Sequence, residues 1–332
     1  MGRSGDVSVK DHGGDLDAAI ARHGGPWHRW IDLSTGINRV PYPVPDISPS
    51  SWQRLPTRAD MNRLVAAARA AYGTDAPLLP VAGAQAAIQL VPGLAPAGRA
   101  AILGPTYNEH RAALEARGWQ VREGRRLEEL AGADLAVVVH PNNPDGRRQE
   151  REPLLDLTAR VGRLVVDESF MDPTPQDSLG GATGRDGLIV LRSFGKFYGL
   201  AGVRLGFVLA GAADVARLAD LAGPWNISGA AIEIGSRALA DHAWARETSR
   251  RLTGEAQRLD ALASAAGWTP AGGTVLFRLY ACADAVEARD CLARHHVWCR
   301  IFPWSRHHVR LGLPGGAEEW HRLEAALQDR GA

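Results

Sequence analysis

Between residues 78 and 209, short apolar runs alternate with amphipathic stretches of helical length. Helical segments are expected from about residue 108 to 117 and from about 152 to 160. Strands built only from aliphatic residues and alternating with helices are typical of a parallel sheet that is buried on both faces. The pattern predicts an α/β domain whose strands include residues 100–103, 135–139, 164–166 and 188–191.

After residue 225 the pattern changes to that of a smaller α+β domain. A long Ala- and Arg-rich helical stretch is expected over about residues 229–266, with a last helix over about 317–328. Between them we expect a strand near 274–279, a helix near 283–295, and strands near 297–301 and 308–313. A Pro-rich segment, 40–49, is expected to cross from an N-terminal arm into the large domain. The predicted organisation is an arm over residues 1–45, a large domain over 46–225 and a small domain over 226–332.

Polar side chains follow the predicted strands at the points where the apolar runs end. Tyr107, Asn143, Asp167, Ser193 and Lys196 all occupy such positions. Open parallel sheets bind ligands beyond the carboxyl ends of their strands. The sequence therefore predicts a small-molecule site at this edge of the sheet.

The composition narrows the class of protein. Hydrophobic residues make up 45% and charged residues 23% of the 332 residues, with a formal net charge of +1. This charge provides no general attraction for nucleic acid or an anionic membrane. The apolar stretches are shorter than a bilayer requires, and the first residues lack an apolar signal core, so we expect a cytoplasmic protein.

Neither the cysteines nor the paired histidines indicate a metal site. Cys282, Cys291 and Cys299 have no Cys-x-x-Cys spacing, so we expect buried free thiols. The two His-His pairs place adjacent side chains on opposite sides of a helix or strand. No bound metal is predicted.

Lys196 is one of only two lysines in a chain with 36 arginines. An arginine keeps its proton, whereas a lysine amine can lose its proton and attack a carbonyl. Composition alone does not distinguish a required amine at position 196 from a lysine that is there by chance. The residues around Lys196 distinguish the two.

Three common sites are absent from the sequence. No two glycines have the Gly-x-Gly spacing of the dinucleotide fingerprint, and Gly195-Lys196 lacks the upstream glycine of a P-loop. Ser193-x-x-Lys196 has the spacing of serine acyl-enzymes, but their Lys-Thr-Gly element cannot exist here because the only other lysine, Lys10, is followed by Asp11.

The remaining residues have the chemistry that pyridoxal phosphate requires: an amine for the aldehyde, a carboxylate for the pyridinium nitrogen and donors for the phosphate. Lys196 and Asp167 supply the first two. Gly83 precedes a helical run whose first amides, at Ala84 and Gln85, could hold a phosphate together with Ser193 and Arg204. Each signal has an ordinary alternative, such as a helix cap for Asp167 and simple packing for Tyr107.

The order and spacing of six motifs resemble the class I and II aminotransferase superfamily over nearly the whole chain. These are Gly83-Ala-Gln85, Pro105-Thr-Tyr107, Pro141-Asn-Asn-Pro-Asp-Gly146, Val166-Asp-Glu168, Ser193-Phe-Gly-Lys196 and Arg204-Leu-Gly-Phe207. The resemblance implies an aspartate aminotransferase-like large domain with a mostly parallel, seven-stranded sheet between helices, and a homodimer. It also implies that Lys196 carries pyridoxal phosphate, Asp167 pairs with its ring nitrogen, Asn143 bonds its phenolic oxygen and Tyr107 stacks on its ring.

Within the superfamily, the chain is similar to the branch of histidinol phosphate aminotransferases and threonine phosphate decarboxylases. The opening elements His12-Gly-Gly-Asp15 and Asp32-Leu-Ser-Thr-Gly-Ile-Asn38, together with Phe170, favour the decarboxylases. The resemblance thus implies decarboxylation of L-threonine phosphate to aminopropanol phosphate in cobalamin biosynthesis. A transaminase of the histidinol phosphate type is the alternative, and a noncatalytic binding module of the same fold is a third.

A small phosphorylated amino acid needs two anion sites, and Arg300 and Arg310 match the substrate-anion arginines of this branch. The expected substrate-binding residues are His12, Gly36, Asn38, Asn143, Arg300 and Arg310. Three positions depart from the branch: Arg39 replaces a proline, Asp145 a threonine, and Leu55 a tyrosine that reaches the cofactor phosphate of the neighbouring subunit.

Overall fold

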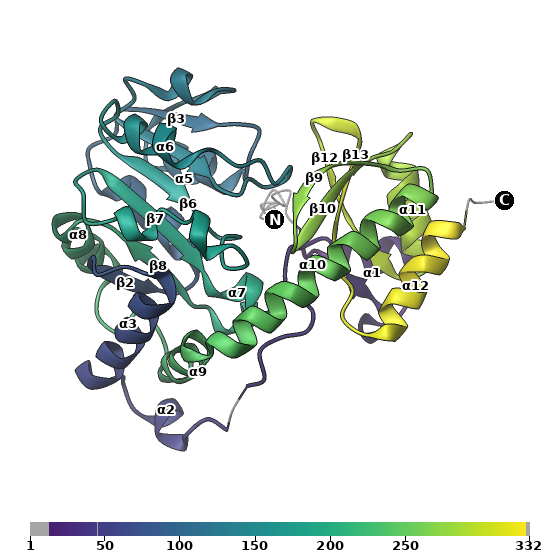
Figure 1. Ribbon diagram of the computed structural model, residues 1–332, viewed down its shortest axis with the longest axis horizontal. Helices are drawn as coiled ribbons and strands as arrows, with labels where there is room; N and C mark the ends of the chain where they lie inside the picture. The colour runs from purple at the N-terminus through teal and green to yellow at the C-terminus, as the bar shows by residue number, and fades with distance from the viewer. Residues whose placement is uncertain (1–12, 45, 330–332) are drawn as a thin grey trace, which may run out of the picture.

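The computed structural model describes residues 13–44 and 46–329. The chain forms a large unit around one sheet and a smaller unit around a second sheet, joined along helix α10 (His242–Ala265) (Figure 1). Within these residues, no helix is both long and apolar enough to cross a membrane.

The large sheet has seven strands, as the resemblance implied. All neighbours are parallel except that β8 runs antiparallel to both β2 and β7. Its order is β2 (Leu78–Val81), β8 (Gly206–Leu209), β7 (Leu188–Ser193), β6 (Leu164–Asp167), β5 (Leu135–Val139), β3 (Arg99–Leu103) and β4 (Gln120–Gly124).

Helices cover both faces of this sheet, which explains the uninterrupted aliphatic strands. In β5, Ala136 and Val138 belong to one buried cluster, whereas Leu135 and Val137 belong to the other. Alternate residues of a strand point to opposite faces, so a strand buried on both sides requires apolar residues at every position. The helices of this unit are α2 (Pro49–Gln53), α3 (Arg58–Tyr72), α4 (Ala84–Leu90), α5 (Glu109–Ala116), α6 (Arg151–Thr158), α7 (Phe194–Phe197), α8 (Ala212–Ala222) and α9 (Gly229–Ala240).

The small unit contains a four-stranded antiparallel sheet in the order β12-β13-β10-β9. Its strands are β9 (Thr269–Thr274), β10 (Phe277–Ala281), β12 (Arg300–Phe302) and β13 (Ser305–Gly312), and its helices include α11 (Ala285–Arg294) and α12 (Ala317–Gln328). The N-terminal arm joins this unit: α1 (Leu16–His23) packs on α11, and β1 (Ile31–Asp32) pairs with β11 (Val297–Trp298) in a separate parallel pair.

Three expected elements were wrong in their boundaries. The helical stretch expected over about 229–266 is divided into two helices, because Asp241 caps α10 by accepting a hydrogen bond from the Trp244 amide. The expected strand near 274–279 spans the turn of a hairpin, with β9 before it and β10 after it. The expected strand at 297–301 divides into β11 and β12, which pair with different partners.

The division between the units at residues 225 and 226 stays a prediction. Helix α9 packs against α2 and α3 of the large unit, while α10 packs against β9, β10 and α12. These contacts favour a change of unit near Asp241. All three cysteines are free, but only Cys299 is buried, so the expectation of buried thiols was wrong for Cys282 and Cys291.

Candidate active site

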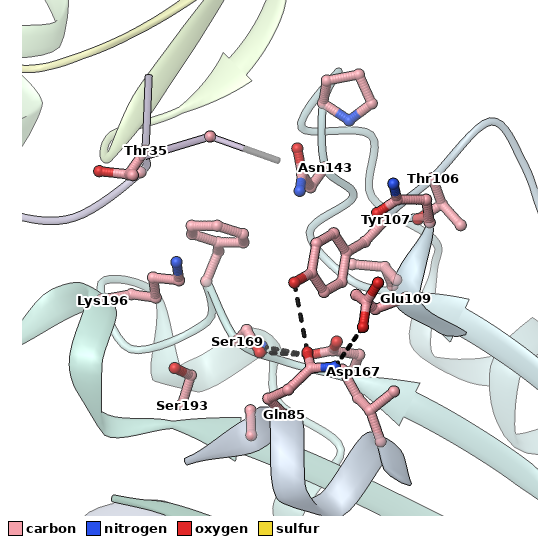
Figure 2. A pocket seen from close by; sticks show the side chains of 18 of the residues that line it. Thr35, Gln85, Thr106, Tyr107, Glu109, Asn143, Asp167, Ser169, Ser193 and Lys196 are labelled. Atoms are coloured by element: carbon pink, nitrogen blue, oxygen red, sulfur yellow. Dashed lines mark hydrogen bonds between the residues drawn. The ribbon is translucent and has the colours of Figure 1, made fainter. Parts of the chain in front are cut away.

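A cavity of about 730 Å³ opens at the carboxyl ends of the parallel strands, facing the small unit. Its lining comes from the strand ends and α4 on one side, and from the arm and the β12–β13 hairpin on the other. Lys196, Tyr107 and Asn143 surround this space, with Asp167 at its floor (Figure 2). Thus the residues that were predicted at separate strand ends share one cavity.

Lys196 lies in α7, directly after β7, and its main-chain oxygen accepts a hydrogen bond from the Asn38 amide over 2.9 Å. Its amine lies 5.8 Å from the centre of the Phe170 ring. Burial, aided by the positive charge of Arg310, lowers the pKa of Lys196 to about 8. Such an amine is neutral in a useful fraction near neutral pH and can act as a nucleophile or a base.

Asp167 ends β6 with its carboxylate buried in the floor of the cavity. It accepts hydrogen bonds from His110 Nε2 over 2.8 Å and from Ser169 Oγ over 2.5 Å. Burial alone would raise the pKa of Asp167, but these hydrogen bonds outweigh it and hold the pKa below its ordinary value. An ionised carboxylate at this point can pair with a protonated ring nitrogen.

Gly83 and Arg204 form one corner of the cavity. Gly83 has φ +81°, and a Cβ atom there would lie 2.7 Å from an Nη atom of Arg204. Ala84 and Gln85 begin α4 and line the cavity beside Ser193. Main-chain amides, a hydroxyl and a guanidinium in one corner are a suitable set of donors for a phosphate group.

Tyr107 and Asn143 stand on the side of the cavity opposite Lys196 (Figure 2). The Tyr107 hydroxyl donates to Gln85 Oε1 over 3.4 Å, and burial raises the pKa of Tyr107 to about 12, so the phenol keeps its proton. The Asn143 oxygen accepts a hydrogen bond from Arg310. This bond directs the Asn143 amide group as a donor, which suits a phenolic oxygen.

Arg300 and Arg310 lie directly opposite each other on the paired strands β12 and β13, and both line the cavity. Arg310 also donates to the Ser34 main-chain oxygen over 2.6 Å. Burial, with the neighbouring charge of Arg300, lowers the pKa of Arg310 to about 10. Like charges placed opposite each other destabilise a sheet, and anions bound between them offset that cost.

One of the expected substrate residues, Asn38, does not line this cavity. Asn38 uses its side-chain amide to hold the main chain, donating to the Phe197 oxygen over 2.9 Å and accepting from Arg251 over 2.9 Å. It therefore supports the Lys196 segment from behind rather than lining the cavity. His12 lies outside the described residues, whereas Gly36 lines the cavity.

An ion-pair network that no sequence pattern indicated lies on the opposite face of the sheet. Arg192, the residue before Ser193, donates to Glu168 over 2.9 Å and also to Asp172, and its guanidinium lies 4.4 Å from the centre of the Tyr72 ring. Glu168 in turn follows Asp167. Because side chains alternate along a strand, this buried network ties the ends of β6 and β7 together beneath the cavity.

The residues present fit pyridoxal phosphate. Lys196 has the amine with a lowered pKa, Asp167 is a buried carboxylate that hydrogen bonds keep ionised, and Gly83 leaves the space that the Arg204 guanidinium occupies. His110 and Ser169, which support Asp167, were missed by the sequence reasoning. His110 is separated from Asp167 by 57 residues and belongs to none of the six motifs.

Comparison with known proteins supplies the family. The sequence model of the family described as "Aminotransferase class I and II" matches residues 54–327. The chain belongs to the class I and II aminotransferase family. Its fold is similar to that of the solved histidinol-phosphate aminotransferase from Sinorhizobium meliloti in complex with pyridoxal-5'-phosphate, with a TM-score of 0.77. The two sequences are 18% identical, and the match covers 94% of this chain and 93% of that one. Pyridoxal phosphate is its cofactor, and the residues described above would hold it.

Two relatives of this aminotransferase family member are more similar in sequence. A threonine-phosphate decarboxylase from Pseudomonas aeruginosa is 44% identical over 324 residues, which cover 96% of this chain and 97% of the relative. A threonine-phosphate decarboxylase from a Sinorhizobium species is 43% identical over 327 residues, which cover 95% of this chain and 97% of the relative.

Proposed function

We propose that the protein catalyses the pyridoxal phosphate-dependent decarboxylation of L-threonine phosphate to aminopropanol phosphate, a building block of the cobalamin side chain. The observation that carries this proposal is the opposed pair Arg300 and Arg310 in the cavity. A substrate with a carboxylate and a phosphate supplies one anion for each guanidinium. The two decarboxylase relatives, which match nearly the whole chain, support the same substrate.

The two arginines have different environments, which suggests different partners. Arg310 is buried at 5% exposure and is fixed by Asn143 and Ser34, close to the cofactor residues. Arg300 is only partly buried, in the short strand that leads to the tip of the hairpin. Arg310 is accordingly the ligand of the carboxylate next to the reacting carbon, and Arg300 is the ligand of the more distant phosphate.

When bound, pyridoxal phosphate would supply an electron sink for the bond that breaks at the substrate α-carbon. Asp167, whose carboxylate accepts hydrogen bonds from His110 and Ser169, would hold the ring nitrogen in its protonated form. Arg310 orients the substrate carboxylate, so that the carbon–carbon bond is the one that breaks and carbon dioxide leaves. Lys196 stands beside the cavity with a pKa of about 8 and can return a proton to the α-carbon.

The position of Phe170 supports decarboxylation as the reaction. Its ring is buried, packs edge-on against Phe277 with 4.9 Å between centroids, and presents an apolar side to the Lys196 amine. Removing carbon dioxide requires no acid or base at this position, because the departing carboxylate carries no proton. An apolar wall also limits the water that reaches the reacting carbon.

The test measures carbon dioxide released from L-threonine phosphate by the purified holoenzyme, with unphosphorylated L-threonine in a parallel assay. Stoichiometric formation of aminopropanol phosphate is the expected result. Absence of carbon dioxide, with transfer of the amino group from an amine such as histidinol phosphate to a 2-ketoacid acceptor, would establish the transaminase alternative. A protein that binds no pyridoxal phosphate would establish a noncatalytic module.

A homodimer and a cytoplasmic location belong to the same proposal. The branch position of Leu55 would face a neighbouring subunit, and its side chain is 61% exposed beside the likewise exposed Trp52. Burial of these apolar side chains against a second copy would remove them from water. Sedimentation of the holoenzyme at a mass near twice 35.6 kDa is the expected result.

A further inference from the structure

The tip of the β12–β13 hairpin forms an aromatic wall over the mouth of the cavity. Phe302, Pro303 and Trp304 all line the cavity, although Trp304 is 51% exposed. The strand pairing slips between Ile301 and Phe302, so that Phe302 pairs with Ser305 instead of continuing the register set by Arg300 and Arg310. Irregularities of this kind bend a strand and redirect its side chains.

The aromatic side chains form a stack that ends at Arg300. The Arg300 guanidinium lies 5.5 Å from the centre of the Phe302 ring. Phe302 stacks on Trp304 with 5.1 Å between centroids and 29° between planes, and Trp304 lies 5.6 Å from the His308 ring. His308 Nδ1 is held 2.7 Å from Ser305 Oγ, so the stack is anchored at its outer end.

This arrangement supplies what Arg300 needs in order to bind a phosphate. An arginine side chain has several rotatable bonds, and ordering it on binding costs free energy. The positive charge of Arg310 on the neighbouring strand also repels the guanidinium. An aromatic face attracts a guanidinium and leaves the N–H groups at its edge available to an anion.

We propose that Phe302 and Trp304 are positioning residues that hold Arg300 against the Arg310 charge, so that this hairpin tip determines selectivity for a phosphorylated side chain. Phe302 contacts the guanidinium directly, and Trp304 fixes the Phe302 ring through the stack. The proposal rests on the phosphorylated substrate of the proposed function. It does not depend on whether the carbon–carbon bond or the carbon–hydrogen bond is broken.

The experiment titrates the holoenzyme with L-threonine phosphate and with L-threonine, following the absorbance of the bound cofactor. Phe302→Leu keeps an apolar side chain and removes the aromatic face. We expect it to weaken binding of L-threonine phosphate about fivefold, with a change of less than about twofold for L-threonine and for kcat. Trp304→Ala is expected to act in the same direction, by about threefold.

Phe302→Tyr is the conservative variant, since it retains the aromatic face, and it should bind L-threonine phosphate like the unaltered enzyme. Trp27→Ala is the matched control, because Trp27 is 69% exposed and does not line the cavity. Unchanged binding of L-threonine phosphate by Phe302→Leu, or an equal loss for both ligands, would overturn the proposal. Because the titration reports binding, an enzyme that releases no carbon dioxide would overturn the proposed function alone.

Discussion

His110 Nε2 lies 2.8 Å from Asp167 Oδ2, and both side chains are almost completely buried. A carboxylate can only accept a hydrogen bond, so the imidazole donates its Nε2 proton to Asp167. His110 is in the first turn of α5 and Asp167 at the end of β6. Their contact couples the helix that follows Tyr107 to the carboxylate that we propose as the partner of the cofactor ring.

Replacing His110 with Phe should raise the pKa of Asp167. Its folded-state pKa lies below the unfolded value, so the ionised carboxylate stabilises the protein above about pH 4, and this stabilisation disappears as the pH falls through the folded-state pKa. Without the hydrogen bond, we expect acid release of the cofactor to begin about one pH unit higher. The absorbance of the bound cofactor, followed as the pH is lowered, measures the pH at which the cofactor is released. The exposed His321→Phe in α12 is the control and should leave the curve unchanged.

Lys196→Arg keeps a cation and removes the amine that can lose its proton. We expect turnover to fall by roughly a thousandfold or more, and borohydride treatment to leave no cofactor label on the chain, since the only other lysine is Lys10. Peptide mapping of the reduced enzyme checks the label. Turnover retained by Lys196→Arg would contradict the role of Lys196.

Lys196→Met tests the lowered pKa of the amine in the cofactor-free protein. Since the folded-state pKa is about 8 and the unfolded one about 10.5, the unfolded chain binds more protons in this interval. The charged amine thus costs stability at pH 7, and Lys196→Met should be more stable there, by on the order of 2 kcal/mol. This advantage should shrink as the pH rises from 8 toward 10.5. Urea unfolding at several pH values measures it, and a pH-independent difference would contradict the lowered pKa.

Gly83→Ala should weaken cofactor binding. The new Cβ would lie 2.7 Å from an Arg204 Nη atom and displace the guanidinium from its corner. We expect a loss of pyridoxal phosphate affinity of about tenfold, beyond the cost of roughly 1 kcal/mol for alanine at positive φ. Gly223→Ala is matched, because Gly223 has φ +72° and no atom within 4 Å of its Cβ position. Equal cofactor affinity in both variants would contradict the role of this corner.

Arg192→Met should destabilise the cofactor-free protein strongly. It leaves Glu168 and Asp172 buried without their cation, for which we expect a loss of about 3 to 5 kcal/mol in the free energy of unfolding. Arg148→Met breaks an ion pair with Asp177 whose side chains are 38% and 43% exposed, and should cost less than about 1 kcal/mol. Urea unfolding of both variants makes the comparison. Similar losses of unfolding free energy in the two variants would contradict a larger stabilising effect of the buried Arg192 ion pairs.

The core of the fold and the gathering of polar residues at one edge of the sheet could be predicted because their signals are local. Aliphatic residues at consecutive strand positions indicated burial on both faces, which the two clusters around β5 confirmed. Parallel strands end at one edge, and Lys196, Asp167 and Asn143 line the cavity there. One of the errors arose where a single side chain ends an element, as Asp241 does between α9 and α10.

The remaining features depend on which distant segments meet, and no local pattern reveals this. Asn38 has the sequence surroundings of a substrate residue, but folding directs it to Arg251 and the Phe197 oxygen. Strand pairing decides that Arg300 faces Arg310, and the slip after Ile301 decides that Phe302 lies under the guanidinium. The sequence determined the sheet and the reactive groups at its edge, because burial and strand ends are local properties. Only the tertiary structure decided which groups hold them in place, because those contacts join residues far apart in the chain.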